Sequence, residues 1–160
     1  MIVKEIFGNN RTDKPSKERV GARGIVLCND KILLVYEQKT DFYMIPGGGL
    51  EQGETENECC IREIEEETGY IVSINGSAFL ELNEYYGDCK YTGYYYICEV
   101  NGHAHQRLTD IEKSRNMIAK WVGFEKAKEI FSYYKSYETE NEEKSAEYLR
   151  EYTALCSIMF

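Results

Sequence analysis

The 160-residue sequence has little proline, with two residues, and it has no apolar run long enough to cross a membrane. A membrane-spanning helix needs about 20 apolar residues, so we expect no transmembrane segment. Residues 1–7 include two charged side chains and do not resemble the apolar core of a secretion signal. The six cysteines include no Cys-x-x-Cys pair. Without a secretion signal, they are expected to be reduced thiols in the cytoplasm.

The sequence also lacks a balance of charge, because 19 Lys and Arg stand against 28 Asp and Glu, a net charge of −9. Nucleic acids and anionic membranes attract basic proteins, so this charge argues against a nucleic-acid polymer or a membrane as partner. An anionic small molecule stays compatible, since a bound divalent cation would reverse the local field. With 42% hydrophobic residues, the chain can bury a core. Its length predicts a single domain over residues 1–160.

Apolar and alternating runs predict several strands. They are expected at residues 1–7, 24–28, 32–36, 42–45, 77–82, 91–100 and 118–124. Asn29 and Asp30 separate two of these runs, which indicates a hairpin.

Three helices are predicted, at residues 54–68, 125–134 and about 140–158. For the last helix, Thr139 and Glu142 form a capping-box pattern. Its apolar side chains form one stripe, which favours core packing, with a dimer contact as the alternative.

The first predicted helix carries an unusual row of carboxylates. On a helical wheel, Glu66 and Glu67 lie within about 60° of Glu63. Like charges at this spacing repel one another, and the dipole disfavours negative charge in the last turn of a helix. Such a face is either solvated by water or holds a cation.

Three glycines, Gly47, Gly48 and Gly49, precede this helix. Glycine lets backbone amides and carbonyls approach a ligand closely. A glycine loop beside carboxylates offers donors for phosphate oxygens and hard oxygen ligands for Mg²⁺ or Mn²⁺. This combination suits hydrolysis of a diphosphate, in which a metal orients the phosphates and activates water.

Residues 48–70 resemble the complete box of the Nudix hydrolases. The positions that carry the resemblance are Gly48, Glu54 and the run Arg62-Glu63-Ile64-Glu65-Glu66-Glu67-Thr68-Gly69. One position departs, because Tyr70 stands where the family usually has a small aliphatic residue. The resemblance implies an α/β fold, a Nudix-type α/β/α sandwich with a mixed β-sheet between helices. It also implies a pyrophosphatase of the MutT-like or ADP-ribose pyrophosphatase-like kind.

The resemblance assigns roles to several residues of the box. It implies that Glu63, Glu66 and Glu67 ligate a divalent metal and act in catalysis, and that the carbonyl of Gly47 adds a ligand. Mg²⁺ is the implied cofactor, or Mn²⁺ in its place. It further implies that Glu54 and Arg62 brace the loop and the helix through a charged hydrogen bond.

Many family members use one more carboxylate outside the box as a ligand or general base. Glu112 is the first candidate, because it precedes a predicted strand as that residue does in similar members. The alternatives are Asp110, Glu84 and Glu99. Arg23 is a candidate for binding a substrate phosphate, since a guanidinium suits that role, and Gly48 is expected to contact the substrate. The aromatic candidates for stacking on a base are Tyr36, Phe42, Tyr85 and Tyr86.

The expected function is therefore Mg²⁺-dependent hydrolysis of a nucleoside diphosphate linked to another moiety. A nucleoside triphosphate, a nucleotide sugar or ADP-ribose would be such a substrate. Relatives commonly dimerise, so a homodimer is a further expectation. Two alternatives share the fold: a nucleotide-sensing module that does not cleave its ligand, and an isomerase of prenyl diphosphates. The intact carboxylates and the intact box argue against them.

Overall fold

The structure is a computed structural model that describes residues 1–159; Phe160, the last residue of the expected domain, lies outside the described residues. The strands are β1 Ile2–Phe7, β2 Lys17–Cys28, β3 Lys31–Glu37, β4 Phe42–Met44, β5 Gly47–Gly49, β6 Tyr70–Ile74, β7 Leu80–Tyr86, β8 Cys89–His103 and β9 Met117–Gly123. The helices are α1 Glu56–Thr68, α2 Asp110–Ser114, α3 Phe124–Ser132 and α4 Glu142–Leu155, with a 3₁₀ helix, η1, at Tyr133–Tyr137.

Within residues 1–159, the strands form a nine-stranded sheet with the order β1-β7-β8-β2-β3-β4. The other three strands each pair with one strand of this order: β5 pairs with β2, β6 with β8 and β9 with β3. The sheet is mixed, because β1–β7 and β2–β8 are parallel whereas β7–β8 and β2–β3 are antiparallel. The β2–β3 pairing covers only two residue pairs, so the sheet opens there into two halves.

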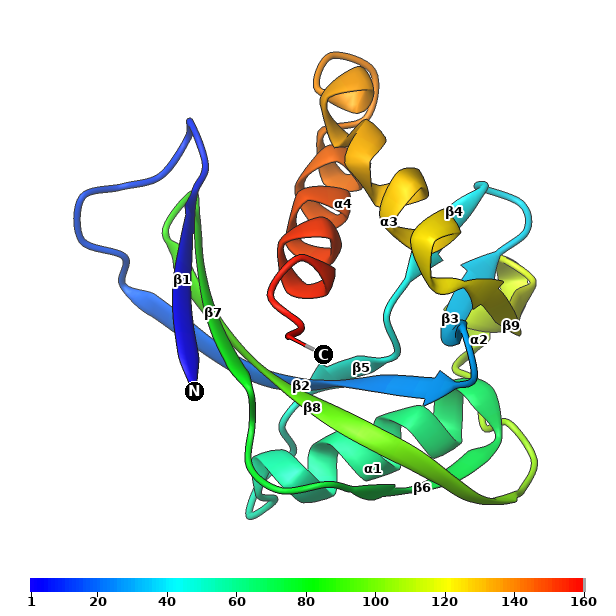
Figure 1. Cartoon of the computed structure of the whole chain (residues 1–160). Helices are drawn as coiled ribbons and strands as arrows, with labels where there is room; N and C mark the ends of the chain where they lie inside the picture. The colour runs from blue at the N-terminus through cyan, green and yellow to red at the C-terminus, as the bar shows by residue number, and fades with distance from the viewer. Residues whose placement is uncertain (160) are drawn as a thin grey trace.

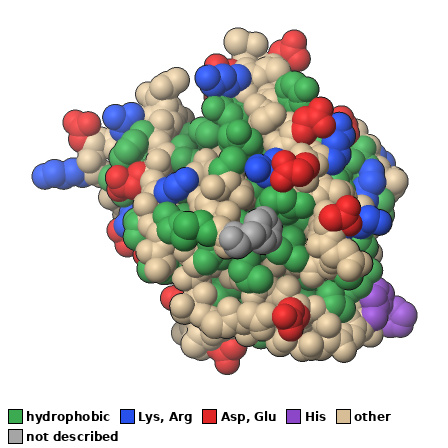
Figure 2. All heavy atoms as spheres, viewed as in Figure 1, with side chains coloured by type: hydrophobic (Ala, Val, Ile, Leu, Met, Phe, Trp, Pro, Cys, Tyr) green, Lys and Arg blue, Asp and Glu red, His purple; other side chains and the backbone are tan. Residues whose placement is uncertain are grey.

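Helices cover both faces of the sheet, with α1 on one side and α3 and α4 on the other (Figure 1). On the α1 side, Cys60 and Ile64 are fully buried against strand residues such as Val26. On the opposite side, Phe131 of α3 and Tyr148 of α4 are buried in a second core. This arrangement confirms the predicted α/β/α sandwich. Charged side chains of both signs are scattered among hydrophobic ones over the face that Figure 2 shows.

The predicted hairpin is confirmed, and Asn29 takes a left-handed conformation at its turn, with φ 54°. Several other strands differ from the prediction in extent. The strand expected at 77–82 begins at Leu80 and continues to Tyr86, and the strand expected at 91–100 extends to both sides as β8. The glycine run forms β5, and β6 and α2 were not predicted. Three glycines carry no strand signal of their own, so only pairing with β2 makes them a strand.

The first helix begins at Glu56 and not at residue 54. Thr55 caps it, because the Thr55 hydroxyl accepts from the Glu58 amide and the Glu58 carboxylate accepts from the Thr55 amide. The predicted cap of the last helix is wrong: Asn141 occupies that position, and its side-chain oxygen accepts from the Lys144 amide at 3.0 Å. An asparagine oxygen serves as an N-cap as well as a hydroxyl does. The 3₁₀ helix η1 ends at Tyr137, and a turn at residues 138–140 leads to Asn141.

The apolar stripe of α4 packs partly as predicted. Tyr148 and Leu155 are buried in the core, whereas Cys156 and Met159 are exposed because the helix ends at Leu155. Among residues 1–159, no helix is both long and apolar enough to span a bilayer.

Candidate active site

The carboxylate row lies in the second half of α1, and Gly69 ends this helix directly after it. Gly69 has φ 76°, and its amide donates to the Glu65 carbonyl at 2.8 Å. A Cβ at this position would lie 2.8 Å from the carbonyl oxygen of Ala104. A glycine is therefore required, both for the left-handed conformation and for the close approach of the loop after β8.

The glycine strand β5 lies between β2 and the carboxylate face of α1. It pairs antiparallel with β2, with Gly47 opposite Arg23 and Gly49 opposite Gly21. A Cβ on Gly48 would lie 2.5 Å from Oε1 of Glu63. The absence of a side chain on Gly48 thus lets the backbone lie directly against this carboxylate.

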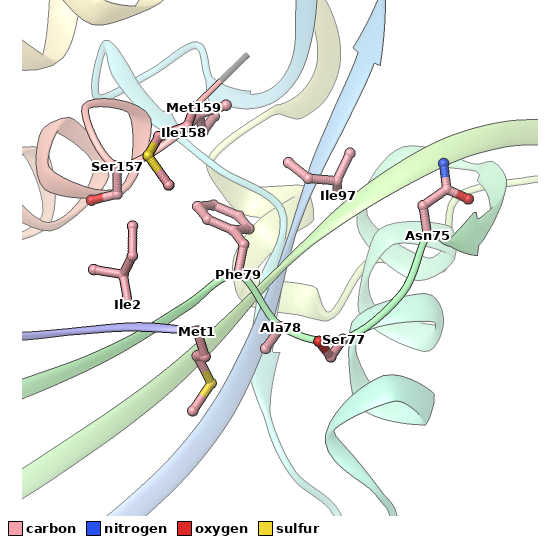
Figure 3. Close-up of a pocket in the computed structure, with 10 residues that line it drawn as sticks. All are labelled: Met1, Ile2, Asn75, Ser77, Ala78, Phe79, Ile97, Ser157, Ile158 and Met159. Carbon is pink, nitrogen blue, oxygen red and sulfur yellow. The ribbon is translucent and has the colours of Figure 1, made fainter.

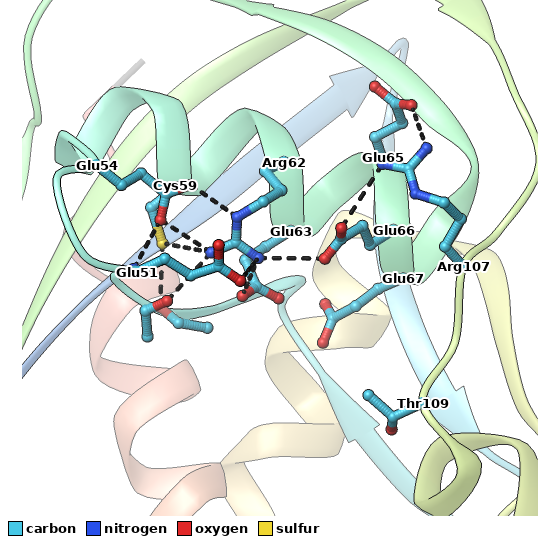
Figure 4. A network of polar contacts seen from close by, with 12 residues as sticks. Glu51, Glu54, Cys59, Arg62, Glu63, Glu65, Glu66, Glu67, Arg107 and Thr109 are labelled. Atoms are coloured by element: carbon cyan, nitrogen blue, oxygen red, sulfur yellow. Dashed lines mark hydrogen bonds and ion pairs between the residues drawn. The ribbon is translucent and has the colours of Figure 1, made fainter.

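Glu54 and Arg62 are in direct contact (Figure 4). The Arg62 Nε donates to Glu54 Oε1 at 2.6 Å, and its Nη2 donates to Oε2 at 2.9 Å. This bidentate pair of hydrogen bonds lowers the pKa of Glu54 to about 2. It joins the loop before α1 to the middle of the helix, where the predicted brace would act.

Glu63, Glu66 and Glu67 extend toward the same side of α1 (Figure 4). The Arg62 Nη1 lies between two of them, donating to Glu63 at 2.8 Å and to Glu66 at 3.1 Å. Glu67 accepts from the Gly47 amide at 2.9 Å. Burial raises the pKa of Glu63, and it raises that of Glu67 to about 8. These two carboxylates therefore lack enough nearby positive charge to offset their desolvation.

The donor set fits a hard divalent cation, since the three carboxylates and the Gly47 carbonyl offer oxygen ligands. A cation would also add positive charge that offsets the desolvation of Glu63 and Glu67. Within residues 1–159, however, no three Asp, Glu, His or Cys side chains are gathered at metal-binding distance. Glu63 and Glu66 are turned toward Arg62, so metal binding requires these two side chains to turn away from its guanidinium.

Glu112 lies close enough to Glu67 to contribute to raising its pKa. It belongs to α2, where its carboxylate accepts from the Thr109 amide at 2.7 Å. The other candidates lie elsewhere: Asp110 is fully exposed, Glu99 is exposed on β8, and Glu84 is buried on β7 on the α4 side. Of the four candidates, Glu112 is the one whose charge raises the pKa of Glu67, although the sequence alone did not predict α2.

Arg23 lies beside the glycine strand, with 19% of its side chain exposed. Its Nη1 donates to the Ile45 carbonyl at 2.9 Å and to the Gly47 carbonyl at 3.4 Å. The same nitrogen lies 3.8 Å from Oε1 of Glu151 in α4. Arg23 thus joins α4 to the backbone next to Glu67, and its binding of a phosphate stays a prediction.

The aromatic candidates for stacking are dispersed. Phe42 is buried edge-on against Tyr148, and Tyr36 stacks on Tyr43 at 4.3 Å. Tyr85 stacks on Phe7 at 5.0 Å, and Tyr86 lines a groove beside α4.

Arg107 was not predicted as part of the site. Its guanidinium lies 2.9 Å from Glu65 and 3.6 Å from Glu66, and its amide donates to the Glu66 carbonyl at 2.7 Å. It lies in the irregular segment after β8, and nothing in the sequence there signals its contact with α1.

A separate apolar hollow of about 430 Å³ lies where the two ends of the described chain meet (Figure 3). Phe79, Ile97 and Ile158 line it together with Met1 and Met159. In the part of the chain that the structure describes, no Asp, Glu, Lys, Arg or His lines this hollow.

Comparison with known proteins identifies the family. The family model described as "NUDIX domain" matches residues 18–145. The chain therefore belongs to the NUDIX domain family, which confirms the resemblance of residues 48–70 and the expectation of a Nudix hydrolase domain.

Two curated relatives illustrate the similarity. An ADP-ribose pyrophosphatase from Methanocaldococcus jannaschii is 41% identical over 84 residues, which cover 43% of this chain and 50% of that protein. The Homo sapiens diphosphoinositol polyphosphate phosphohydrolase NUDT4B is 30% identical over 146 residues, covering 86% of this chain and 77% of that protein.

The aligned length differs greatly among relatives. The match to the Saccharomyces cerevisiae mRNA-decapping enzyme subunit 2 is 35% identical over 72 residues and spans only 7% of that protein. Among solved structures, a NUDIX hydrolase from Nitrosomonas europaea has a TM-score of 0.60 at 19% identity, covering 90% of this chain and 97% of that one. This likeness shows the fold alone.

Proposed function

We propose that this chain is a Mg²⁺-dependent hydrolase of a nucleoside diphosphate linked to another moiety. One observation carries the proposal: Glu63, Glu66 and Glu67 share one face of α1 directly beside the glycine strand. The relative named as an ADP-ribose pyrophosphatase supports this substrate class. The proposal takes residues 1–160 as one cytoplasmic domain whose partner is a small molecule and not a nucleic-acid polymer or a membrane.

In the proposed reaction, Glu63, Glu66 and Glu67 hold the cation with the carbonyl of Gly47. A bound divalent cation neutralises charge on the diphosphate and lowers the pKa of water. The hydrogen bond from the Gly47 amide keeps Glu67 at the edge of the glycine strand. Arg62 donates to Glu63 and Glu66, and these two carboxylates turn from its guanidinium when they hold the cation.

Two residues outside the box complete the proposed site. Glu112 acts as the general base that accepts a proton from the attacking water, since it is the candidate that lies near Glu67. Arg23 binds a substrate phosphate from the α4 side, beside Gly47. Gly48 lets the substrate approach the backbone, because it has no side chain between the strand and Glu63.

The test is a panel of nucleoside triphosphates, nucleotide sugars, ADP-ribose and dinucleoside polyphosphates with Mg²⁺ or Mn²⁺. Glu67→Gln is expected to lower turnover at least about 100-fold, as loss of a metal ligand should. Glu65→Gln is the matched control on the same helix, because Glu65 pairs with Arg107 and not with the glycine strand. Near-normal Mg²⁺-dependent activity of Glu67→Gln would contradict the assignment.

The same panel distinguishes the alternative of a nucleotide sensor. A sensor would bind a nucleotide, measured by calorimetry, without releasing a product. We further propose a homodimer, as is common among relatives, and light scattering after size exclusion measures its mass directly.

A further inference from the structure

A groove of about 870 Å³ lies between α4 and the α4-facing side of the sheet. Its walls come from the end of β1 and the loop after it, from β7 and β8, and from η1 and α4. Glu84, Tyr86 and Tyr91 line its sheet side, and Glu142 and Glu147 line its helix side. None of the α1 carboxylates lines this groove, so the groove is separate from the proposed hydrolytic centre.

The lining of the groove is strongly acidic. Five carboxylates line it, those of Glu84, Glu138, Glu142, Glu143 and Glu147, against the guanidinium groups of Arg19 and Arg150. Arg150 is already paired, because its Nη2 lies 2.8 Å from Glu151 and 3.1 Å from Glu147. A phosphate would therefore meet an excess of negative charge here, whereas a cation would be attracted.

Glu84 is the buried end of this acidic lining. The residue is only 8% exposed, and it faces Tyr91 across the β7–β8 pair. Within residues 1–159, its carboxylate has no hydrogen-bond or ion-pair partner, although Arg150 and Arg23 attract it at longer range. Burial raises the pKa of this carboxyl. The Glu84 carboxylate opens onto the groove, so a cationic ligand there would supply the partner that it lacks.

The rest of the groove suits the apolar part of an organic cation. The rings of Tyr86, Tyr91 and Tyr134 line it, and aromatic faces attract ammonium groups and pack against alkyl chains. Glu138 and Glu142 add two further carboxylates on the η1 and α4 side. In the described part of the chain, neither of these carboxylates makes an ion pair. The groove thus offers carboxylates at a buried end and on a flank, with aromatic surface among them.

We propose that this groove binds an aliphatic diamine or polyamine, with one ammonium group on Glu84 and the second near Glu138 and Glu142. The alkyl chain between the two charges lies against the tyrosine rings. This proposal concerns a second site and does not depend on the hydrolase activity proposed above.

Isothermal titration calorimetry at constant ionic strength tests the proposal with putrescine and spermidine. Saturable binding of both is expected, with butylamine binding at least about tenfold more weakly because it has one charge. The neutral 1,4-butanediol and the anionic succinate are expected to give no heat beyond dilution. Equal affinity for butylamine and putrescine, or no saturable heat with either polyamine, would overturn the proposal.

Variants locate the site. Glu84→Gln keeps the shape of the side chain and removes its charge, and it is expected to weaken putrescine binding at least about tenfold. Glu140→Gln is the matched control, because Glu140 is exposed in the turn before α4 and does not line the groove. Unchanged affinity in Glu84→Gln, with the same circular dichroism spectrum as the parent, would refute the assignment of Glu84.

A second variant keeps the proposal testable if Glu84→Gln does not fold. The double variant Glu138→Gln/Glu142→Gln changes only surface carboxylates and is expected to weaken spermidine binding several-fold while leaving butylamine binding unchanged. An equal loss for both amines would contradict the placement of the second ammonium group.

Discussion

The contact between Glu54 and Arg62 gives the sharpest prediction about stability. Glu54→Gln keeps the size of the side chain but removes the charge that accepts both Arg62 hydrogen bonds. The pKa of Glu54 falls from 4.5 to about 2 in the folded protein. At 1.36 kcal/mol per pKa unit, this sets a ceiling of about 3.4 kcal/mol.

The expected loss is smaller than this ceiling. Solvent reaches the pair and screens it in part, because 12% of the Glu54 side chain and 20% of the Arg62 side chain are exposed. Arg62 also keeps its contacts with Glu63 and Glu66. We therefore expect Glu54→Gln to lower the free energy of unfolding by about 1–2 kcal/mol at pH 7.

The pH dependence of this difference has a definite sign. The folded-state pKa of Glu54 is depressed, so its stabilisation is complete above about pH 5 and is lost as the pH falls toward about 2. The difference between the parent and Glu54→Gln is thus largest at neutral pH and shrinks between pH 5 and pH 3.

Urea denaturation followed by circular dichroism at pH 7, 5 and 3 measures this difference. Glu51→Gln is the control, because Glu51 is 72% exposed and lies 3.9 Å from the same guanidinium; a change below about 0.5 kcal/mol is expected. A Glu54→Gln variant as stable as the parent at pH 7, or a difference independent of pH, would refute the reasoning.

Three further predictions follow from the fold. Gly69→Ala is expected to destabilise the chain by about 1–2 kcal/mol in urea melts, because φ is 76° and a backbone oxygen lies 2.8 Å from the added Cβ; an unchanged midpoint would contradict this. Phe131→Ala removes a fully buried ring and should cost about 3–5 kcal/mol, whereas a loss under 1 kcal/mol would mean that the core refills. In a thiol titration of the native protein, the exposed Cys28 and Cys156 should react first and the four buried thiols slowly, since burial raises the pKa of Cys59 to about 12; fast reaction of all six thiols would contradict the burial.

Much of the site was predictable because its residues lie within one local stretch. Helical geometry alone places Glu63, Glu66 and Glu67 on one face, and the glycines next to the helix imply a close backbone approach. The sandwich followed from the family resemblance.

Tertiary structure decided what depends on partners distant in sequence. The glycine run is a strand only because β2 pairs with it, and Arg107 reaches α1 from a loop without a signal of its own. Glu112 raises the pKa of Glu67 from a separate short helix, α2, that follows 42 residues after α1 in the sequence. The predicted strand ended at residue 82, before Glu84, whereas β7 continues to Tyr86 and places Glu84, only 8% exposed, in the groove beside α4. Local spacing determines which side chains share a face of a helix, whereas the packing of the whole chain determines which distant residues contact that face.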